Sequence, residues 1–440
     1  MRNYPIADTA AELVIDPTPL APVTTDNMLS RLARRARAGL ENSRRPIIIW
    51  LSHKMRLTIN PRPTRRLSRL TLLLLLPFVP SLVQALPAGE QVVGGQATIT
   101  RPTPQALTVK QETQKVAIDW RNFNIARGES VVFNQPNAQA VALNRVLSGD
   151  PSHIFGSLKA NGSVFLVNSA GVYFAPGAAV NVGSFVGSTL SMSTQDFMAG
   201  NYRFTNNGNA AGIENQGSIQ AQNGGYIALL GPQVSNSGSL QAQQGSVALA
   251  AGNRVTLAMG AGGMLNVNVD ASALKAKIAN KGDVIAGGGQ VHVTARSADA
   301  LLDTVINTSG TVRASSLQQR DGKIILDGGS RGIVQTSGKL NAASADGKGG
   351  TIKVLGDKIA VSSTANLDAS GKTGGGEILI GGNFQGKGTE QNASKTNIAA
   401  GASIKADALE NGDGGKVVVW ADDRTRFEGS ISAKGGAQGG

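Results

Sequence analysis

The chain has 440 residues, a formal net charge of +13 at pH 7 and no cysteine, so neither disulfides nor thiolate chemistry contribute to it. The basic charge is concentrated at one end: residues 1–85 carry 13 Lys and Arg against 5 Asp and Glu, and residues 86–440 carry 29 against 24. A targeting signal accounts for this distribution better than phosphate binding, so we expect no nucleic-acid partner.

Residues 55–85 have the three parts of a signal peptide. A basic stretch at 62–69 precedes an apolar run at 70–80, and a small-x-small pattern ends at Ala85. We expect cleavage between Ala85 and Leu86. A membrane-spanning helix is the alternative. The apolar run is shorter than the roughly 20 residues that a span needs, and Pro77 and Pro80 interrupt it, so we expect no integral membrane span.

Residues 1–54 form an extension before this leader. Two interpretations remain open: an extended leader of the kind that some large exported proteins carry, or a start codon assigned too far upstream. We prefer the second, since Met55 would begin a signal peptide of ordinary length.

The glycine content rises and the proline content falls after the leader. Only Gly39 of the 56 glycines precedes residue 86, and no proline lies beyond Pro232. Such a composition is unlike that of a disordered linker. It fits short strands that need all of their backbone N–H groups and are joined by tight glycine turns.

Short alternating runs bounded by Gly, Asn or Ser recur from about residue 94 onward, and each predicts a strand. They lie at 131–133, 164–167, 227–230, 247–250, 323–326, 351–355, 377–380 and 416–420. We expect no helix, apart from a possible turn near 271–278.

The runs belong to a repeat that places one apolar residue at equivalent positions along the chain. These residues are Ile219, Leu240, Val284, Val312, Leu340, Leu367, Ile404 and Ile431, and the 44-residue step from Leu240 to Val284 suggests an additional coil. Repeats of this length with several strands each predict a parallel β-solenoid whose coils lie about 4.8 Å apart. An antiparallel sandwich is the alternative, but it would not produce such regular self-similarity.

One region, residues 86–250, also carries ordered motifs. They occupy 118–125, 131–137, 142–146, 162–168 and 179–190, and include Asn134-Gln135-Pro136-Asn137 and Asn168-Ser169-Ala170-Gly171. This region resembles the N-terminal domain of the filamentous-haemagglutinin family, the exoproteins of two-partner secretion. Asn168 and Gly171 match the family's Asn-Pro-Asn-Gly-Ile motif, and Ser169 and Ala170 depart from it. The later coils, such as 413–420, resemble the high-molecular-weight adhesin branch.

The resemblance implies an all-β, right-handed parallel β-helix with an N-terminal cap. It implies a secretion domain at 86–260 and a repeat region at 261–440, which we expect to be truncated. The implied partner is an outer-membrane β-barrel transporter with periplasmic recognition domains. The chain would pass through the periplasm and then reach the cell surface or medium of a Gram-negative bacterium. The candidate secretion-motif residues are Asn134, Gln135, Pro136, Asn137, Asn144, Asn168, Gly171 and Asn181.

The expected role is that of an adhesin with a host-cell or surface receptor. The alternatives are a toxin or haemolysin and a haem-acquisition exoprotein, because all three would share one export domain. We expect no enzyme and no catalytic, metal or cofactor site. The Gly-x-Ser-x-Gly pattern at 328–332 is followed by a predicted strand rather than by the helix that a nucleophile elbow requires. Three glycosylation acceptor patterns begin at Asn161, Asn307 and Asn392.

Overall fold

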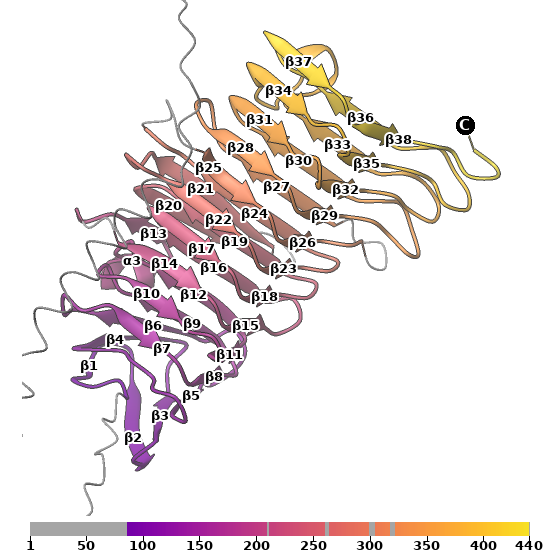
Figure 1. The fold of residues 1–440 in the computed structure, drawn as a ribbon. Coiled ribbons are helices and arrows are strands. Elements are labelled where there is room, and N and C mark those ends of the chain that lie inside the picture. The colour runs from indigo at the N-terminus through magenta and orange to yellow at the C-terminus, as the bar shows by residue number, and fades with distance from the viewer. Residues whose placement is uncertain (1–85, 209–210, 260–263, 299–303, 317–321, 440) are drawn as a thin grey trace, which may run out of the picture. The chain divides into compact units, whose positions relative to one another are not determined.

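The computed structural model describes residues 86–208, 211–259, 264–298, 304–316 and 322–439. The predicted leader, including Ala85, lies outside these ranges. The described residues fold as a right-handed parallel β-helix in which successive coils add strands to three long sheets (Figure 1). The predicted fold class is confirmed.

The three sheets of the helix have 12, 10 and 13 strands. The 12-strand sheet contains β1 (Gln91–Gly94), β4 (Lys115–Trp120), β6 (Val141–Val146), β9 (Ser163–Val167), β12 (Ser184–Ser188), β16 (Tyr226–Gly231), β19 (Ser246–Ala251), β24 (Gln290–Ala295), β27 (Lys323–Asp327), β30 (Thr351–Leu355), β33 (Glu377–Ile380) and β36 (Lys416–Val419). The 10-strand sheet contains β7 (Ser152–Ile154), β10 (Val172–Phe174), β14 (Gly212–Asn215), β17 (Gln233–Asn236), β22 (Lys277–Asn280), β25 (Thr304–Thr308), β28 (Ile333–Thr336), β31 (Lys358–Val361), β34 (Lys395–Ile398) and β37 (Arg424–Phe427). The 13-strand sheet contains β2 (Ala97–Thr103), β3 (Ala106–Gln111), β5 (Ser130–Asn134), β8 (Ser157–Ala160), β11 (Ala179–Val182), β15 (Ser218–Ala221), β18 (Ser239–Gln241), β23 (Asp283–Ile285), β26 (Thr311–Arg313), β29 (Lys339–Asn341), β32 (Asn366–Asp368), β35 (Ser403–Lys405) and β38 (Ser430–Ser432).

The apolar positions predicted from the repeat stack directly on one another in the 13-strand sheet. Each residue from Ile219 to Ile431 in that series is in register with its equivalent one coil away. All of them are buried except Ile431, which lies in the last described coil and is 46% exposed. The repeat assignment is therefore confirmed residue by residue.

The additional coil expected between Leu240 and Val284 does not exist, and that expectation was wrong. Leu240 pairs with Val284 itself. The intervening residues leave the helix as the hairpin of β20 (Arg254–Met259) and β21 (Leu265–Ala271), which pairs antiparallel with β13 (Tyr202–Thr205). An alternating hairpin strand has the same sequence pattern as a coil strand, so the pattern could not separate the two.

This small sheet and the helix α3 (Thr194–Ala199) cover the outer face of the 12-strand sheet with a second apolar layer. Phe165 lies in this layer, against the rings of Phe197 and Tyr202 at centroid distances of 6.0 and 5.1 Å. Strands under the layer, such as β16 and β19, are buried on both faces, whereas β27 beyond it alternates. No helix was expected here; α3 has only six residues.

The N-terminal end is closed by antiparallel pairing, which confirms the implied cap. β1 pairs antiparallel with β4, and β2 pairs antiparallel with β3. Arg101 on β2 forms an ion pair of 2.7 Å with Glu90, and this hydrogen-bonded contact lowers the pKa of the Glu90 carboxyl. Antiparallel strands therefore end two of the three sheets there, and the third ends at β7, to which Ile125 is joined by an isolated bridge to Ile154.

Glycines immediately before the strands of the 13-strand sheet form a column in which backbones touch. A Cβ built at Gly282, Gly310 or Gly338 would overlap the carbonyl oxygen of the equivalent glycine one coil earlier. None of the three has a positive φ, so close approach rather than backbone conformation excludes a side chain there.

We therefore expect Gly310→Ala to lower the free energy of unfolding by at least about 2 kcal/mol, because two coils must separate to admit the methyl group. Gly149→Ala is the control, since a Cβ at Gly149 meets nothing within 4 Å. Urea unfolding followed by circular dichroism measures both. Equal midpoints for the two variants would contradict the stacking argument.

His292 on β24 lies where the second layer ends, paired between Ala248 and Ile325. Burial lowers the pKa of its imidazole from 6.5 to about 4, and the neighbouring charge of Lys323 acts in the same direction while Asp327 opposes it. Its Nε2 lies 2.9 Å from Gln290 Oε1.

The unfolded chain therefore binds a proton at His292 more readily than the folded chain. Stability from this residue is complete above pH 6.5 and falls as the pH drops toward 4, by up to about 3 kcal/mol. His292→Gln should flatten this part of the stability-against-pH curve. Identical curves for both proteins between pH 7 and 4 would refute the assignment.

Candidate functional site

The first candidate motif forms a turn at 134–137, between β5 and β6. Gln135 is 7% exposed, and its side-chain amide connects three coils. Its Oε1 accepts from Gly162 N at 2.8 Å, and its Nε2 donates to Gln111 Oε1 at 2.9 Å and to Ser163 O at 3.2 Å. The backbone of Gln135 also exchanges two hydrogen bonds with the side chain of Asn161, of 2.7 and 2.8 Å.

The outer part of the same turn faces solvent. Asn134 and Pro136 are exposed, and Asn137 is partly exposed. Asn137 Oδ1 accepts from Gln139 N at 3.0 Å, which closes a local Asx turn. This turn therefore combines a buried amide that joins coils with a rigid, accessible tip.

Asn144 on β6 lies in the interior rather than on the surface. It is fully buried and stacks between Ile118 and Leu166. Its Oδ1 accepts the indole N–H of Trp120 at 3.0 Å, and its Nδ2 donates to Phe165 O at 3.3 Å. Trp120 can be buried here because Asn144 satisfies its only polar group.

The second motif forms a turn at 168–171, between β9 and β10. Asn168 is 1% exposed; its Nδ2 donates to Asp150 O at 2.9 Å and to Ser152 Oγ at 3.0 Å, and its Oδ1 accepts from Ala170 N at 2.9 Å. Gly171 has a φ of +126°, which a residue with a side chain rarely adopts. The turn is held by these two residues although Ser169 and Ala170 depart from the family motif.

The last candidate residues lie apart from both turns. Asn181 is exposed on β11, in the 13-strand sheet. Leu86, on the mature side of the predicted cleavage, packs against the main core. The structure thus separates the candidates into two groups: Gln135, Asn144 and Asn168 are buried and hydrogen-bonded, whereas Asn134, Pro136 and Asn181 are accessible.

Two contacts that the sequence analysis missed fasten the second layer to the first coils. Arg145 forms a bidentate pair with Asp119 on the preceding coil, at 2.7 and 2.8 Å, and donates to Met192 O at 3.3 Å. Lys115 Nζ donates to the carbonyl oxygens of Phe197 and Met198 at the end of α3, at 3.2 and 3.0 Å. The partners in each contact lie far apart in the sequence, and only the folded structure shows that they meet.

The described residues hold no group of three or more His, Cys, Asp or Glu that could bind a metal ion. Within the same ranges, no helix is long and apolar enough to cross a membrane. The segment after Gly328-Gly-Ser-Arg-Gly332 is the strand β28, so the nucleophile-elbow interpretation remains excluded on structural grounds.

The described residues thus form a β-helix with an antiparallel cap, whose first coils are joined by buried amides. A model of the TPS secretion domain, the domain of two-partner secretion, matches residues 83–342. The chain belongs to this family.

Known proteins agree with that assignment. The HMW1 secretion domain from Haemophilus influenzae superposes with a TM-score of 0.71 at 30% identity, covering 80% of this chain and 91% of that one. A "Heme/hemopexin-binding protein" of Haemophilus influenzae is 31% identical over 263 residues, which is 54% of this chain. A second protein of that name, from strain ATCC 51907 / DSM 11121 / KW20 / Rd, is 27% identical over 259 residues, or 55% of this chain. The matches span 28% and 27% of the length of these curated relatives.

The buried Asn144 gives a direct test of the structural group. Asn144→Leu has a similar volume but leaves the Trp120 indole N–H without a partner, so the free energy of unfolding should fall by about 1–3 kcal/mol. Asn181→Ala, an exposed change, should alter it by less than about 0.5 kcal/mol. Equilibrium unfolding followed by Trp fluorescence compares them. A neutral Asn144→Leu would show that the amide is dispensable for the fold.

Proposed function

We propose that the chain is exported through the periplasm to the cell surface or the medium, with an outer-membrane transporter as its partner, as its membership of the TPS secretion domain family implies. We propose that the two groups of motif residues divide this task. The exposed tip of the 134–137 turn, together with Asn181, is recognised by periplasmic domains of the transporter. The buried amides of Gln135, Asn144 and Asn168 order the first coils once the chain has crossed. The separation of the motif into accessible and buried residues is the observation that supports this division.

Folding outside the cell then makes transport directional. The capped first coils leave an unpaired edge at their C-terminal side, on which the next coil can form. Each coil then buries aliphatic side chains worth about 1.5–3 kcal/mol each. The described chain contains no disulfide that would have to form first. Residues 86–260 act as the export domain in this proposal, and residues 261–440 extend the stack that it begins.

For the exoprotein as a whole we propose adhesion, with a receptor on a host cell or other surface. The similarity to the HMW1 secretion domain supports an export role shared with that exoprotein. Haem acquisition is the second candidate, favoured by the 31% identity to a heme/hemopexin-binding protein. We propose no catalytic activity for either, because the matching family and relatives are named for secretion and binding and not for a reaction.

The export proposal is tested by secretion of the tagged chain in cells with and without the matched transporter. Folded protein should reach the medium only when the transporter is present. Asn134→Ala with Pro136→Ala should reduce secretion at least about tenfold, the loss expected from a contact that dominates an interface. Purified from inclusion bodies and refolded, this variant should unfold at the wild-type urea midpoint.

Gln139→Ala is the matched control, because Gln139 is exposed in the adjacent loop and uses only its backbone N–H. Unchanged secretion of the double variant would remove the turn from recognition. A lowered urea midpoint would show that the turn acts through stability instead. Export of the wild-type chain without the transporter would refute the export proposal as a whole.

A further inference from the structure

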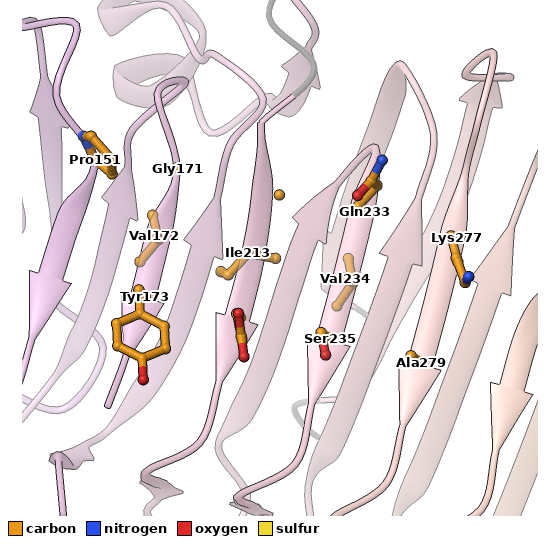
Figure 2. Close-up of a pocket in the computed structure, with 12 residues that line it drawn as sticks. Pro151, Gly171, Val172, Tyr173, Ile213, Gln233, Val234, Ser235, Lys277 and Ala279 are labelled. Carbon is orange, nitrogen blue, oxygen red and sulfur yellow. The ribbon is translucent and has the colours of Figure 1, made fainter. Parts of the chain in front are cut away.

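A groove of about 340 Å³ crosses the outer face of the 10-strand sheet, over β10, β14, β17 and β22. Tyr173 stands at one end and Lys277 at the other, with Glu214, Gln233 and Ser235 between them. Figure 2 shows Tyr173, Ser235 and Ala279 on three strands of this sheet, with the strand of Ile213 between those of Tyr173 and Ser235. From Tyr173 to Ala279 the groove crosses three strand spacings, or about 14 Å.

Glycines and small side chains make up part of the floor of the groove. Gly171 and Gly212 lie together, with a Cβ at Gly171 only 3.6 Å from Gly212 O. Gly212 has no positive φ, so its backbone does not require glycine. Ser235 and Ala279 continue the floor, whereas the same outward row carries Gln335 further along the sheet.

The Tyr173 end of the groove is aromatic and structured. The rings of His153, Phe155 and Tyr173 pack at centroid distances of 6.1–6.4 Å, and Phe155 is 39% exposed. Tyr173 Oη donates to Gln216 Oε1 at 3.3 Å, and Gln216 Nε2 donates to Glu214 Oε1 at 2.5 Å. The half-buried ring of Tyr173 therefore lies beside the hydrogen-bonded carboxylate of Glu214.

These features exclude several kinds of occupant. A peptide cannot add as a strand, because β10, β14, β17 and β22 are each paired on both sides. A polyanion such as nucleic acid would meet Glu214 and find only Lys277 as a cation in the lining. His153 and Tyr173 project from adjacent strands of one face, so they cannot bind the two opposite sides of one haem iron.

We infer that this groove binds a short, uncharged oligosaccharide outside the cell. One pyranose ring would place its C–H face on the Tyr173 ring, and hydroxyl groups of the next rings would hydrogen-bond to Glu214, Gln233 and Ser235. The site is assembled from four coils, so it exists only in the folded chain. The extracellular location rests on the proposed function, in which the chain folds after crossing the outer membrane.

The test uses the full chain purified from the medium, with maltotriose, N-acetylated chitotriose and trigalacturonate as probes in isothermal titration calorimetry. At least one of the two uncharged trisaccharides should bind with a dissociation constant below about 1 mM. Tyr173→Ala should weaken that binding at least about tenfold. Ser235→Gln should do the same by filling the floor, in a row where Gln335 shows that glutamine is accommodated.

Gln335→Ser is the matched control, since it makes the reverse change in the same row outside the groove, and it should bind like the wild type. Saturable binding by none of the three probes overturns the inference, and so does binding that Tyr173→Ala and Ser235→Gln leave unchanged. Binding of trigalacturonate alone also overturns it, by showing a polyanion surface. A chain that is secreted normally but binds no probe refutes this inference while leaving the export proposal intact.

Discussion

The in-register pairing of each coil with the next is the constraint on which the rest of this structure depends. Parallel strands about 4.8 Å apart place every residue on its own equivalent, so an inward position must suit a whole column and not a single site. The aliphatic series from Ile219 to Ile404 satisfies this requirement, and the glycine column at Gly282 and Gly310 satisfies it where backbones touch. A coil has no stable partner other than its neighbours, which is why the first coil needs a cap.

Polar residues enter the interior only where the column supplies their partners. Asn215 donates to Asn236 at 2.8 Å and Asn236 donates to Asn280 at 2.7 Å, so three buried amides form a ladder at one corner. The first coils have no such repeated ladder: Gln135 pairs with the amide of Gln111, whereas Asn144 and Asn168 each bond to a different kind of group on a neighbouring coil. Large rings such as Trp120 and Phe123, which meet edge to face at 5.5 Å, fill that end of the core. Each N-terminal coil therefore has its own set of interior residues, whereas the later coils carry similar residues at equivalent positions.

The in-register stacking of the coils also determines which features of the fold can be predicted from the sequence. Columns of equivalent residues repeat along the chain, so eight of the coil strands and the apolar column from Ile219 to Ile431 were predicted and confirmed, whereas the additional coil before Val284 was wrong. Features outside the repeat were missed: α3 is too short to show a helical period, and the β20–β21 hairpin imitates a coil. The burial of the motif residues was also hidden. An asparagine at an inward position and one at a turn look alike in sequence, and the bond from Trp120 to Asn144 spans 24 residues.

Outward-facing positions do not have to match their equivalents on neighbouring coils. Their side chains can therefore vary and form a binding site on a solenoid. The outward row of the 10-strand sheet runs from Tyr173 through Ser235 and Ala279 to Gln335, so it mixes large, small and polar side chains without a common type. The inward neighbours Val172, Ile213 and Val234 remain aliphatic and buried. A change in the outer row leaves the core column intact, since alternate residues of a strand face opposite sides. A shallow site on the outer face therefore requires no change in the inward columns by which each coil stacks on the last.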